Sequence, residues 1–428
     1  MKKKAGLLKC TSLVASNMIG SGALLAPMVL APYGSWAIIG WVLTAIGAMA
    51  LALCFSKLSE WIPGAGGPYM YVQKVFGNFM GFQISWGYWF STWCGSASLV
   101  IGALQYLSIF FPEISTSNTI SMLLGLSMIW SFTAINMRGI NESMFVSVII
   151  LFIKTVPLIL FALIGIFYFN PDVVFSDFAV PKNERMALLS MAQPLLWSFM
   201  GLESATVPSD SVDEPKKTIP VATVLGVTIT ALVYIVGSII IAGVTPKSIL
   251  LASKAPYVDA GYIIAGEWGR LFLIVTGIIG LIGSLNGWIL IHGQVSYSAA
   301  KNGLFPHVFT QKNKYGAPIG IVIGSICMSI LFVLSYTGSL ASQINTLIDL
   351  SVFAMVLPYF YCVIALIYIA YTKKNTLSLV EKCMLAIVVS IAFIYSFLSI
   401  YSAGQSLISI GFLTVLLLSP LYIFINKH

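Results

Sequence analysis

Ser16-Asn17-Met18-Ile19-Gly20-Ser21-Gly22-Ala23 and Trp197-Ser198-Phe199-Met200-Gly201-Leu202-Glu203-Ser204 are the two stretches that decide the fold. Each lies inside an apolar segment of spanning length, and each contains glycine and polar residues that weaken a helix. Within a bilayer every backbone N–H and C=O group must be paired, so a helix-breaking sequence is tolerated only against packed protein or a cavity. The two stretches therefore predict two broken helices around an internal site.

Most of the remaining chain is also spanning sequence. Of its 428 residues, 58% are apolar and only 8% are charged, whereas a soluble domain carries about a quarter charged residues. A helix needs about 20 apolar residues to cross a bilayer. Hydropathy places such segments at about 6–30, 36–61, 80–111, 118–136, 143–169, 187–208, 219–245, 270–298, 317–337, 343–371, 380–402 and 405–425. We therefore predict an all-α integral membrane protein with 12 transmembrane helices in a single domain, residues 1–428.

Basic residues are distributed unevenly between alternate loops. With the N-terminus in the cytoplasm, sixteen of the 22 lysines and arginines fall in inner loops and five in outer loops, while Lys154 lies inside the fifth segment. Cytoplasmic loops of membrane proteins carry an excess of Lys and Arg. We therefore predict a multi-pass protein of the cell (inner) membrane with both termini in the cytoplasm. The net charge of +8 is explained by this topology and not by nucleic-acid binding.

The two breaks occupy equivalent positions in two five-helix units. Gly20 and Gly201 are 181 residues apart, in the first and sixth segments. Because five is an odd number, the second unit runs in the opposite direction. This predicts a five-plus-five inverted repeat with broken helices 1 and 6, over about 6–169 and 187–371, followed by two extra helices over about 380–425. The alternative is that each glycine is only a packing residue at a helix contact.

Broken helices expose two kinds of backbone group. The start of a second half-helix presents N–H groups with partial positive charge, which suit a carboxylate. The end of a first half-helix presents carbonyl groups, which suit an ammonium group. The first kind is expected at Ser21, Gly22 and Ala23, and the second at Asn17, Met18, Trp197 and Met200. Together these groups predict a receptor for the backbone of an α-amino acid.

Four ionisable residues lie within predicted spans, where such residues are rare and default to functional hypotheses. Glu203, beside the second break, is the strongest candidate. We expect His292 to be a packed, hydrogen-bonded histidine. Asp349 either faces a vestibule or caps its helix. Lys154 either extends to the interface or pairs with a helix end.

Seven stretches of the sequence resemble the amino acid–polyamine–organocation (APC) superfamily, specifically its basic amino acid/polyamine antiporters. They occur in the family's order, at residues 17–22, 66–69, 196–205, 215–220, 283–288, 303–306 and 357–359. The arginine/agmatine exchangers are the most similar branch, and the lysine/cadaverine and ornithine/putrescine exchangers also fit. The resemblance implies an antiporter that works by alternating access, without a cofactor or metal. It would exchange a cationic, arginine-like amino acid for its agmatine-like amine, or for a related amino acid or polyamine.

The resemblance also implies roles for individual residues. Ser21 and Gly22 would bind the carboxylate, and Met18, Trp197 and Met200 would offer carbonyls to the amino group. Trp288 would stack on the distal cation, in a pocket lined by Ser91, Thr92, Ser96 and Ser351. The residues expected to act in gating or proton response are Tyr88, Trp197, Glu203, Trp288 and Tyr359. The last two helices often form a homodimer contact in this family.

Three features depart from the arginine/agmatine pattern. Ser96 stands where that pattern has Asn, and Leu99 stands where it has Met. The loop after the sixth segment is acidic, with Asp210, Asp213 and Glu214, where near relatives are more basic. Selectivity for a guanidinium group, and exchange with a decarboxylated product, are therefore left open.

Three other functions compete with exchange. A proton-coupled amino acid uptake permease would use the same fold, and Glu203 would serve either mechanism. A membrane-embedded enzyme would need paired carboxylates, an activated nucleophile or a metal cluster, but the ionisable residues are dispersed and no H-E-x-x-H or G-x-S-x-G motif is present. We therefore predict that the protein is not an enzyme. A channel is disfavoured because no filter sequence or ring of like charges is visible.

Overall fold

The computed structural model describes residues 4–34, 36–175, 184–253, 255–337, 340–402 and 422, and these ranges are helical apart from short connections and two isolated β-bridges. The α-helices are α1 (Leu7–Met18), α2 (Ser21–Leu30), α3 (Trp36–Trp61), α4 (Pro68–Leu107), α5 (Glu113–Thr116), α6 (Asn118–Asn136), α7 (Ile140–Gly165), α8 (Pro171–Phe175), α9 (Glu184–Ser198), α10 (Pro215–Val244), α11 (Lys247–Ala252), α12 (Pro256–Lys301), α13 (Gly320–Leu334), α14 (Leu340–Thr372) and α15 (Leu379–Ser402).

Seven helices within these ranges are long and apolar enough to cross a membrane. They are Trp36–Trp61, Asn118–Asn136, Ile140–Tyr168, Pro215–Val244, Pro256–Lys301, Leu347–Thr372 and Leu379–Ser402. The other predicted spans up to residue 402 also coincide with helices, which are either interrupted (α1 with α2), short (α9 and α13) or less apolar (α4). The twelfth predicted span, 405–425, lies outside the described residues apart from residue 422.

Both expected helix breaks are present. α1 ends at Met18 and α2 begins at Ser21, and the intervening Gly20 has φ −159° and ψ −116°. α9 ends at Ser198, and the chain turns irregularly before a short 3-10 helix, η3 (Ser204–Thr206). Within this second break Gly201 has φ +108°, a conformation that side chains other than hydrogen rarely allow. The glycines are therefore part of the breaks and not only packing residues.

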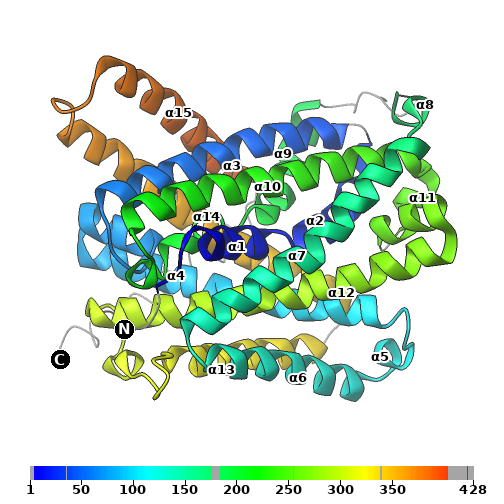
Figure 1. Ribbon diagram of the computed structural model, residues 1–428, viewed down its shortest axis with the longest axis horizontal. Coiled ribbons are helices and arrows are strands. Elements are labelled where there is room, and N and C mark those ends of the chain that lie inside the picture. Colours follow the sequence, from blue (N-terminus) through cyan, green and yellow to red (C-terminus); the bar gives the residue numbers. More distant parts are fainter. Residues whose placement is uncertain are drawn as a thin grey trace.

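α1 lies in the middle of the bundle and packs against α7, α10 and α12 (Figure 1). α4 packs against both α12 and α14, so it joins the first half of the chain to the second. α6 and α13 lie side by side at one edge, and α15 packs on α3 and α14 at another (Figure 1). The chain around the two breaks is thus enclosed by α3, α4, α10, α12 and α14.

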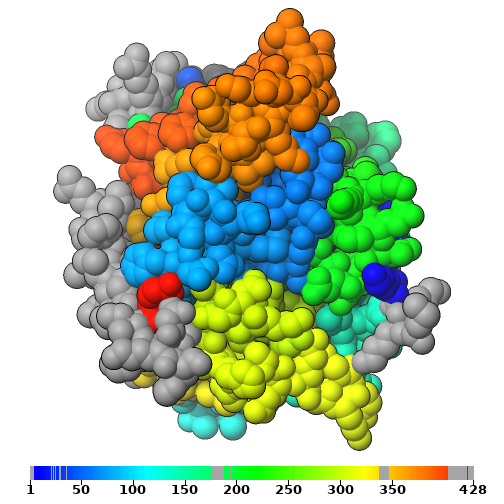
Figure 2. Space-filling model, turned by 90° about the vertical axis from the view of Figure 1, so that its left-hand side faces the viewer, coloured from blue at the N-terminus to red at the C-terminus, as the bar shows by residue number. Residues whose placement is uncertain are grey.

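Connections that carry several of the predicted cytoplasmic lysines, among them Lys312, Lys314, Lys373 and Lys374, gather at one end of the bundle. Figure 2 shows the connections between α3 and α4, after α12, and between α14 and α15 on one face. Contacts between chain segments at this end include Ala5 with Ser211, Lys9 with Asn141, Trp61 with Lys373, Tyr69 with Ser298, and Met137 with Asn313. The distribution of basic residues in the sequence therefore corresponds to a real surface of the fold.

Candidate functional site

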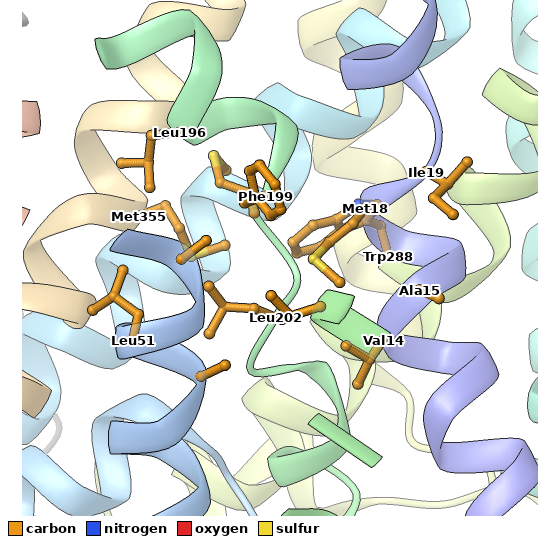
Figure 3. Packing of buried hydrophobic residues seen from close by; sticks show 14 of the residues in the cluster. Val14, Ala15, Met18, Ile19, Leu51, Leu196, Phe199, Leu202, Trp288 and Met355 are labelled. Carbon is orange, nitrogen blue, oxygen red and sulfur yellow. The ribbon is translucent and has the colours of Figure 1, made fainter. Parts of the chain in front are cut away.

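A small cavity lies between the two breaks. Its lining residues come from α1, α4, α12, α14 and the chain around the second break: Asn17, Met18, Ser91, Thr92, Gly95, Leu99, Trp197, Met200, Trp288 and Ser351. Figure 3 shows Met18, Phe199 and Trp288 between the interruption that follows α1 and the irregular chain that follows α9. The cavity is therefore bounded by the backbone features that the sequence predicts for a ligand site.

Seven of the ten residues that the sequence assigned to substrate binding line this cavity, namely Met18, Ser91, Thr92, Trp197, Met200, Trp288 and Ser351. Ser96 is buried on α4 but does not line the cavity. Ser21 begins α2, and its side chain lies outside what the structure describes.

Gly22 is held in a close contact between helices. A Cβ atom added at Gly22 would lie 2.5 Å from the Cα atom of Ser198, the last residue of α9. This glycine therefore allows α2 to approach the end of α9. A larger residue here would push the two breaks apart whether or not a carboxylate binds nearby, so its substitution does not test carboxylate binding specifically.

One wall of the cavity is formed where α4 meets α14. The Ser91 hydroxyl donates to the carbonyl of Ser351 at 2.8 Å, and the Ser351 hydroxyl donates to the carbonyl of Ser91 at 2.9 Å. Thr92 donates to the carbonyl of Trp89 at 2.6 Å. With their protons committed to backbone carbonyls, the three hydroxyl oxygens retain acceptor capacity, which suits a ligand that carries N–H donors.

Two lining residues, Gly95 and Leu99, were not assigned a binding role from the sequence. Asn17, which the sequence predicted to present a carbonyl group, also lines the cavity, and its side-chain amide donates to the Ser204 hydroxyl at 2.8 Å, which joins α1 to η3. Gly95 and Leu99 follow Ser91 at four-residue spacing, which places all three on one helix face.

Glu203 links the second break to both α4 and α14. Tyr88 donates to one of its carboxyl oxygens at 2.6 Å, and Tyr359 donates to the other at 2.5 Å. The N–H of Gly201 donates to the Tyr359 hydroxyl at 3.3 Å. All four residues are buried. Three of the five side chains that the resemblance assigned to gating or proton response, those of Tyr88, Glu203 and Tyr359, therefore form one hydrogen-bonded cluster.

Lys154 pairs with the end of the first half-helix and does not extend to the membrane interface. Its ammonium group donates to the carbonyl of Ser16 at 2.6 Å and to the Ser284 hydroxyl at 3.0 Å. Ser284 in turn donates to the carbonyls of Ser16 and Ile19 at 2.9 and 3.2 Å. A buried lysine and a hydroxyl therefore satisfy carbonyls at the first break.

The other two in-span ionisable residues lie outside the cavity lining. His292 is fully buried, with its Nε2 atom 3.0 Å from the carbonyl oxygen of Ile321, as expected for a packed, hydrogen-bonded histidine. Asp349 is partly buried on α14, two residues before Ser351.

Comparison with known proteins decides the family. The sequence profile of the family described as "Amino acid permease" matches residues 6–425. The chain belongs to this amino acid permease family. The antiporter-branch resemblance seen in the sequence is supported by relatives of the same superfamily, and the permease is a multi-pass membrane transporter and not an enzyme.

Several named relatives of the permease match along most of their length. It is 32% identical to the cadaverine/lysine antiporter of Escherichia coli over 372 residues, covering 85% of this chain and 83% of that protein. It is 30% identical to the Escherichia coli putrescine transporter PotE, covering 99% of this chain and 98% of that protein. It is also 30% identical to a putative arginine/ornithine antiporter of Bacillus subtilis, covering 83% and 82%.

A solved structure shares the fold of the permease. The manganese transporter of Eremococcus coleocola superimposes with a TM-score of 0.61 at 12% sequence identity, covering 99% of this chain and 94% of that one. At this low identity the similarity concerns the fold alone, which is that of a membrane transporter.

Proposed function

We propose that the permease is an antiporter that exchanges a cationic amino acid for a related amine or amino acid. The observation that carries this proposal is the composition of the cavity between the breaks. Helix-end residues Met18 and Trp197 form one part of its wall, and the hydroxyl-lined contact between α4 and α14 forms another. Helix ends suit an amino acid backbone, and the acceptor oxygens suit a second group that carries N–H donors.

Trp288 supplies the group that would distinguish a cationic side chain. It is 7% exposed and lies beside the second break, where a Cβ added at Gly201 would be 3.3 Å from its ring. The face of an indole ring attracts a cation. The described lining residues include no carboxylate, so aromatic and hydroxyl groups would recognise the cation. The names of the three relatives, which include lysine, cadaverine, putrescine, arginine and ornithine, support this substrate class.

The arginine/agmatine pair predicted from the sequence is one of three candidate pairs. Ser96, which replaces the family's Asn, does not line the cavity, whereas Leu99 does. Neither side chain therefore supplies an amide for a guanidinium group. We propose exchange of a basic amino acid in general and treat arginine with agmatine, lysine with cadaverine, and ornithine with putrescine as alternatives to be measured.

We also propose that the permease contains a five-plus-five inverted repeat, residues 6–169 and 187–371, with two further helices beyond it. A second pair of features, besides the two breaks, supports this. α4 starts at Pro68 and loses helical geometry at Gly77, and α12 starts at Pro256 and loses it at Ala265 and Gly266. Gly77 and Gly266 are 189 residues apart, close to the 181 that separate Gly20 from Gly201.

The membrane orientation and the oligomer are further parts of the proposal. The gathering of lysine-bearing loops on one face (Figure 2) supports an inner-membrane protein whose termini are cytoplasmic. The homodimer implied by the family resemblance remains a prediction, because most of the last predicted helix lies outside the described residues.

Counterflow in proteoliposomes tests the proposed function. Vesicles preloaded with unlabelled lysine, arginine or ornithine, or with the matching amine, should take up the labelled amino acid, while empty vesicles should not. Uptake into empty vesicles that requires only an inward proton gradient would instead establish proton-coupled uptake without exchange. Flux that does not saturate with substrate concentration would indicate a channel.

A further inference from the structure

Tyr234, on α10, lies where the ends of both first half-helices meet. Its hydroxyl contacts the carbonyl oxygen of Met18 at 2.5 Å and that of Ser198 at 3.0 Å. Met18 is the last residue of α1, and Ser198 is the last residue of α9. The side chain is 1% exposed. One buried hydroxyl donor is therefore shared by the terminal carbonyls of the two breaks.

These two carbonyls belong to helix ends of the same sign. The last carbonyls of an α-helix have no partner within the helix and carry partial negative charge. Two such ends that face each other in apolar surroundings repel unless a donor lies between them. A carbonyl oxygen has two lone pairs, so a hydrogen bond from Tyr234 leaves each oxygen able to accept a second donor from a ligand.

The position of the Tyr234 hydroxyl is set by a helix that is not broken. α10 runs without interruption from Pro215 to Val244. It packs closely on α1, because a Cβ added at Gly226 would lie 2.5 Å from a methyl carbon of Val14. The Tyr234 ring is 5.0 Å from that of Trp41 and 5.4 Å from that of Phe199. The ring is thus fixed independently of the hydrogen bonds that its hydroxyl makes.

We propose that Tyr234 is a positioning residue for the α-ammonium group of the substrate. Its hydroxyl holds the carbonyls of Met18 and Ser198 at a set separation, so that one ammonium group can meet the negative ends of both half-helices. This inference rests on the proposed function only in requiring an amino acid as substrate. It does not require the substrate side chain to be cationic.

The test compares amino acids with analogues that lack only the α-amino group. Binding of lysine and 6-aminohexanoate, and of leucine and 4-methylpentanoate, is measured on purified full-length protein and on Tyr234→Phe. Phenylalanine keeps the ring contacts and removes the hydroxyl. We expect the amino acid to bind about five- to tenfold more weakly to Tyr234→Phe, the effect of one lost hydrogen bond. The matching analogue should change less than twofold.

Tyr257→Phe is the matched control. Tyr257 is a buried tyrosine on α12. Its hydroxyl lies against Gly237, which is on α10 as Tyr234 is, and not against a break. Its variant should leave all four affinities within about twofold of the parent, since no helix-end carbonyl loses a donor. If the analogues do not compete in any protein, a fall in amino acid affinity in Tyr234→Phe alone still supports the proposal.

The other outcomes overturn it. Equal losses for an amino acid and its analogue, an unchanged amino acid affinity, or failure of Tyr234→Phe to fold would reduce Tyr234 to an architectural residue. Equal wild-type affinity for an amino acid and its analogue would show that no α-ammonium subsite exists. Binding of the leucine pair but not the lysine pair would contradict the cationic substrate while leaving the Tyr234 test valid. Binding of neither pair would contradict both proposals.

Discussion

The two helix breaks are held by different chemistry. The first break is short, with only residues 19 and 20 between α1 and α2. Its carbonyls accept hydrogen bonds from Lys154 on α7 and Ser284 on α12. Lys154 and Ser284 donate to backbone carbonyls, so these hydrogen bonds do not depend on any side chain of the break itself. The first break is therefore held in place by neighbouring helices through its backbone.

The second break is longer and carries an ionisable group of its own. Glu203 lies at its end and accepts hydrogen bonds from Tyr88 on α4 and Tyr359 on α14. A carboxyl group can gain or lose a proton and can exchange tyrosine partners for water, whereas the carbonyls of the first break cannot ionise. We propose that helix ends of both breaks hold the substrate backbone, and that the second break, through Glu203, also couples the site to opening and to protons.

Removing the support at the first break should have the largest effect. Lys154→Met keeps the length of the side chain but deletes one hydrogen bond to the Ser16 carbonyl at the break and one to the Ser284 hydroxyl on α12. We expect the free energy of unfolding to fall by about 1–3 kcal/mol and exchange to fall by about 100-fold, because a misplaced half-helix displaces the bound substrate. Thermal unfolding in detergent and proteoliposome exchange measure the two effects.

Lys9→Met is the control for this substitution. Lys9 also joins α1 to the start of α7, through Asn141, but it is only partly buried. It lies in the first turn of α1, at the opposite end of that helix from the break. Its variant should keep exchange within about twofold, as expected for a partly exposed contact. Equal loss in both variants would mean that Lys154 serves only general packing.

Glu203→Gln should separate the two breaks by their response to pH. Glutamine keeps the shape and can still bond to the tyrosines, but it cannot ionise. Substrate binding should remain within about threefold, because the bonds lost are weak net contributors, while the dependence of exchange on pH should flatten. Asp210→Asn, a change at an exposed carboxyl in the short 3-10 helix η4 (Ser209–Ser211), should leave the profile as in the parent.

A pH profile of Glu203→Gln that overlays the parent would remove Glu203 from proton coupling. It would leave the residue as a hydrogen-bonding link between α4 and α14. The contrast between a fixed and an ionisable break would then be wrong.

Trp288→Leu should affect charge recognition and leave both breaks in place. Loss of a cation–π contact should weaken a cationic amino acid by about 1–2 kcal/mol, which is about 5- to 30-fold in affinity. A neutral amino acid of similar length should lose much less. Trp130→Leu, at a ring 40% exposed on α6, is the control. Equal losses for the cationic and neutral ligands would restrict Trp288 to shape.

The smallest effect separates the two serines that the sequence grouped together. Ser351 lines the cavity and exchanges hydrogen bonds with Ser91, whereas Ser96 does not line it. Ser351→Ala should weaken substrate binding by about three- to tenfold through one lost polar contact, and Ser96→Ala by less than about twofold. Isothermal titration measures both. A larger loss at Ser96 would place the distal end of the ligand elsewhere on α4.

The sequence predicted the features that depend on local chemistry. Glycine and polar residues within apolar spans located both breaks, and the distribution of lysines located the face shown in Figure 2. The family resemblance, and not helical spacing, assigned Ser91 and Thr92 to a pocket, and both line the cavity.

The sequence could not predict contacts made across the bundle. Tyr234 is an ordinary tyrosine in an apolar helix, and only the packing of α10 against α1 and α9 brings its hydroxyl to two carbonyls. Gly22 was predicted to lie beside a carboxylate, but its close contact with Ser198 depends on how two half-helices meet. Such contacts join residues from 36 to 216 positions apart in the sequence, and no local pattern specifies them.

The most direct test of the account is a structure of the permease with lysine bound, or with whichever basic amino acid shows the strongest counterflow. The account predicts that the ligand lies between the two breaks, with its α-ammonium group within about 3.2 Å of the Met18 carbonyl and its side chain along Trp288. Well-defined ligand density outside this cavity, or an ammonium group that contacts neither half-helix, would contradict it.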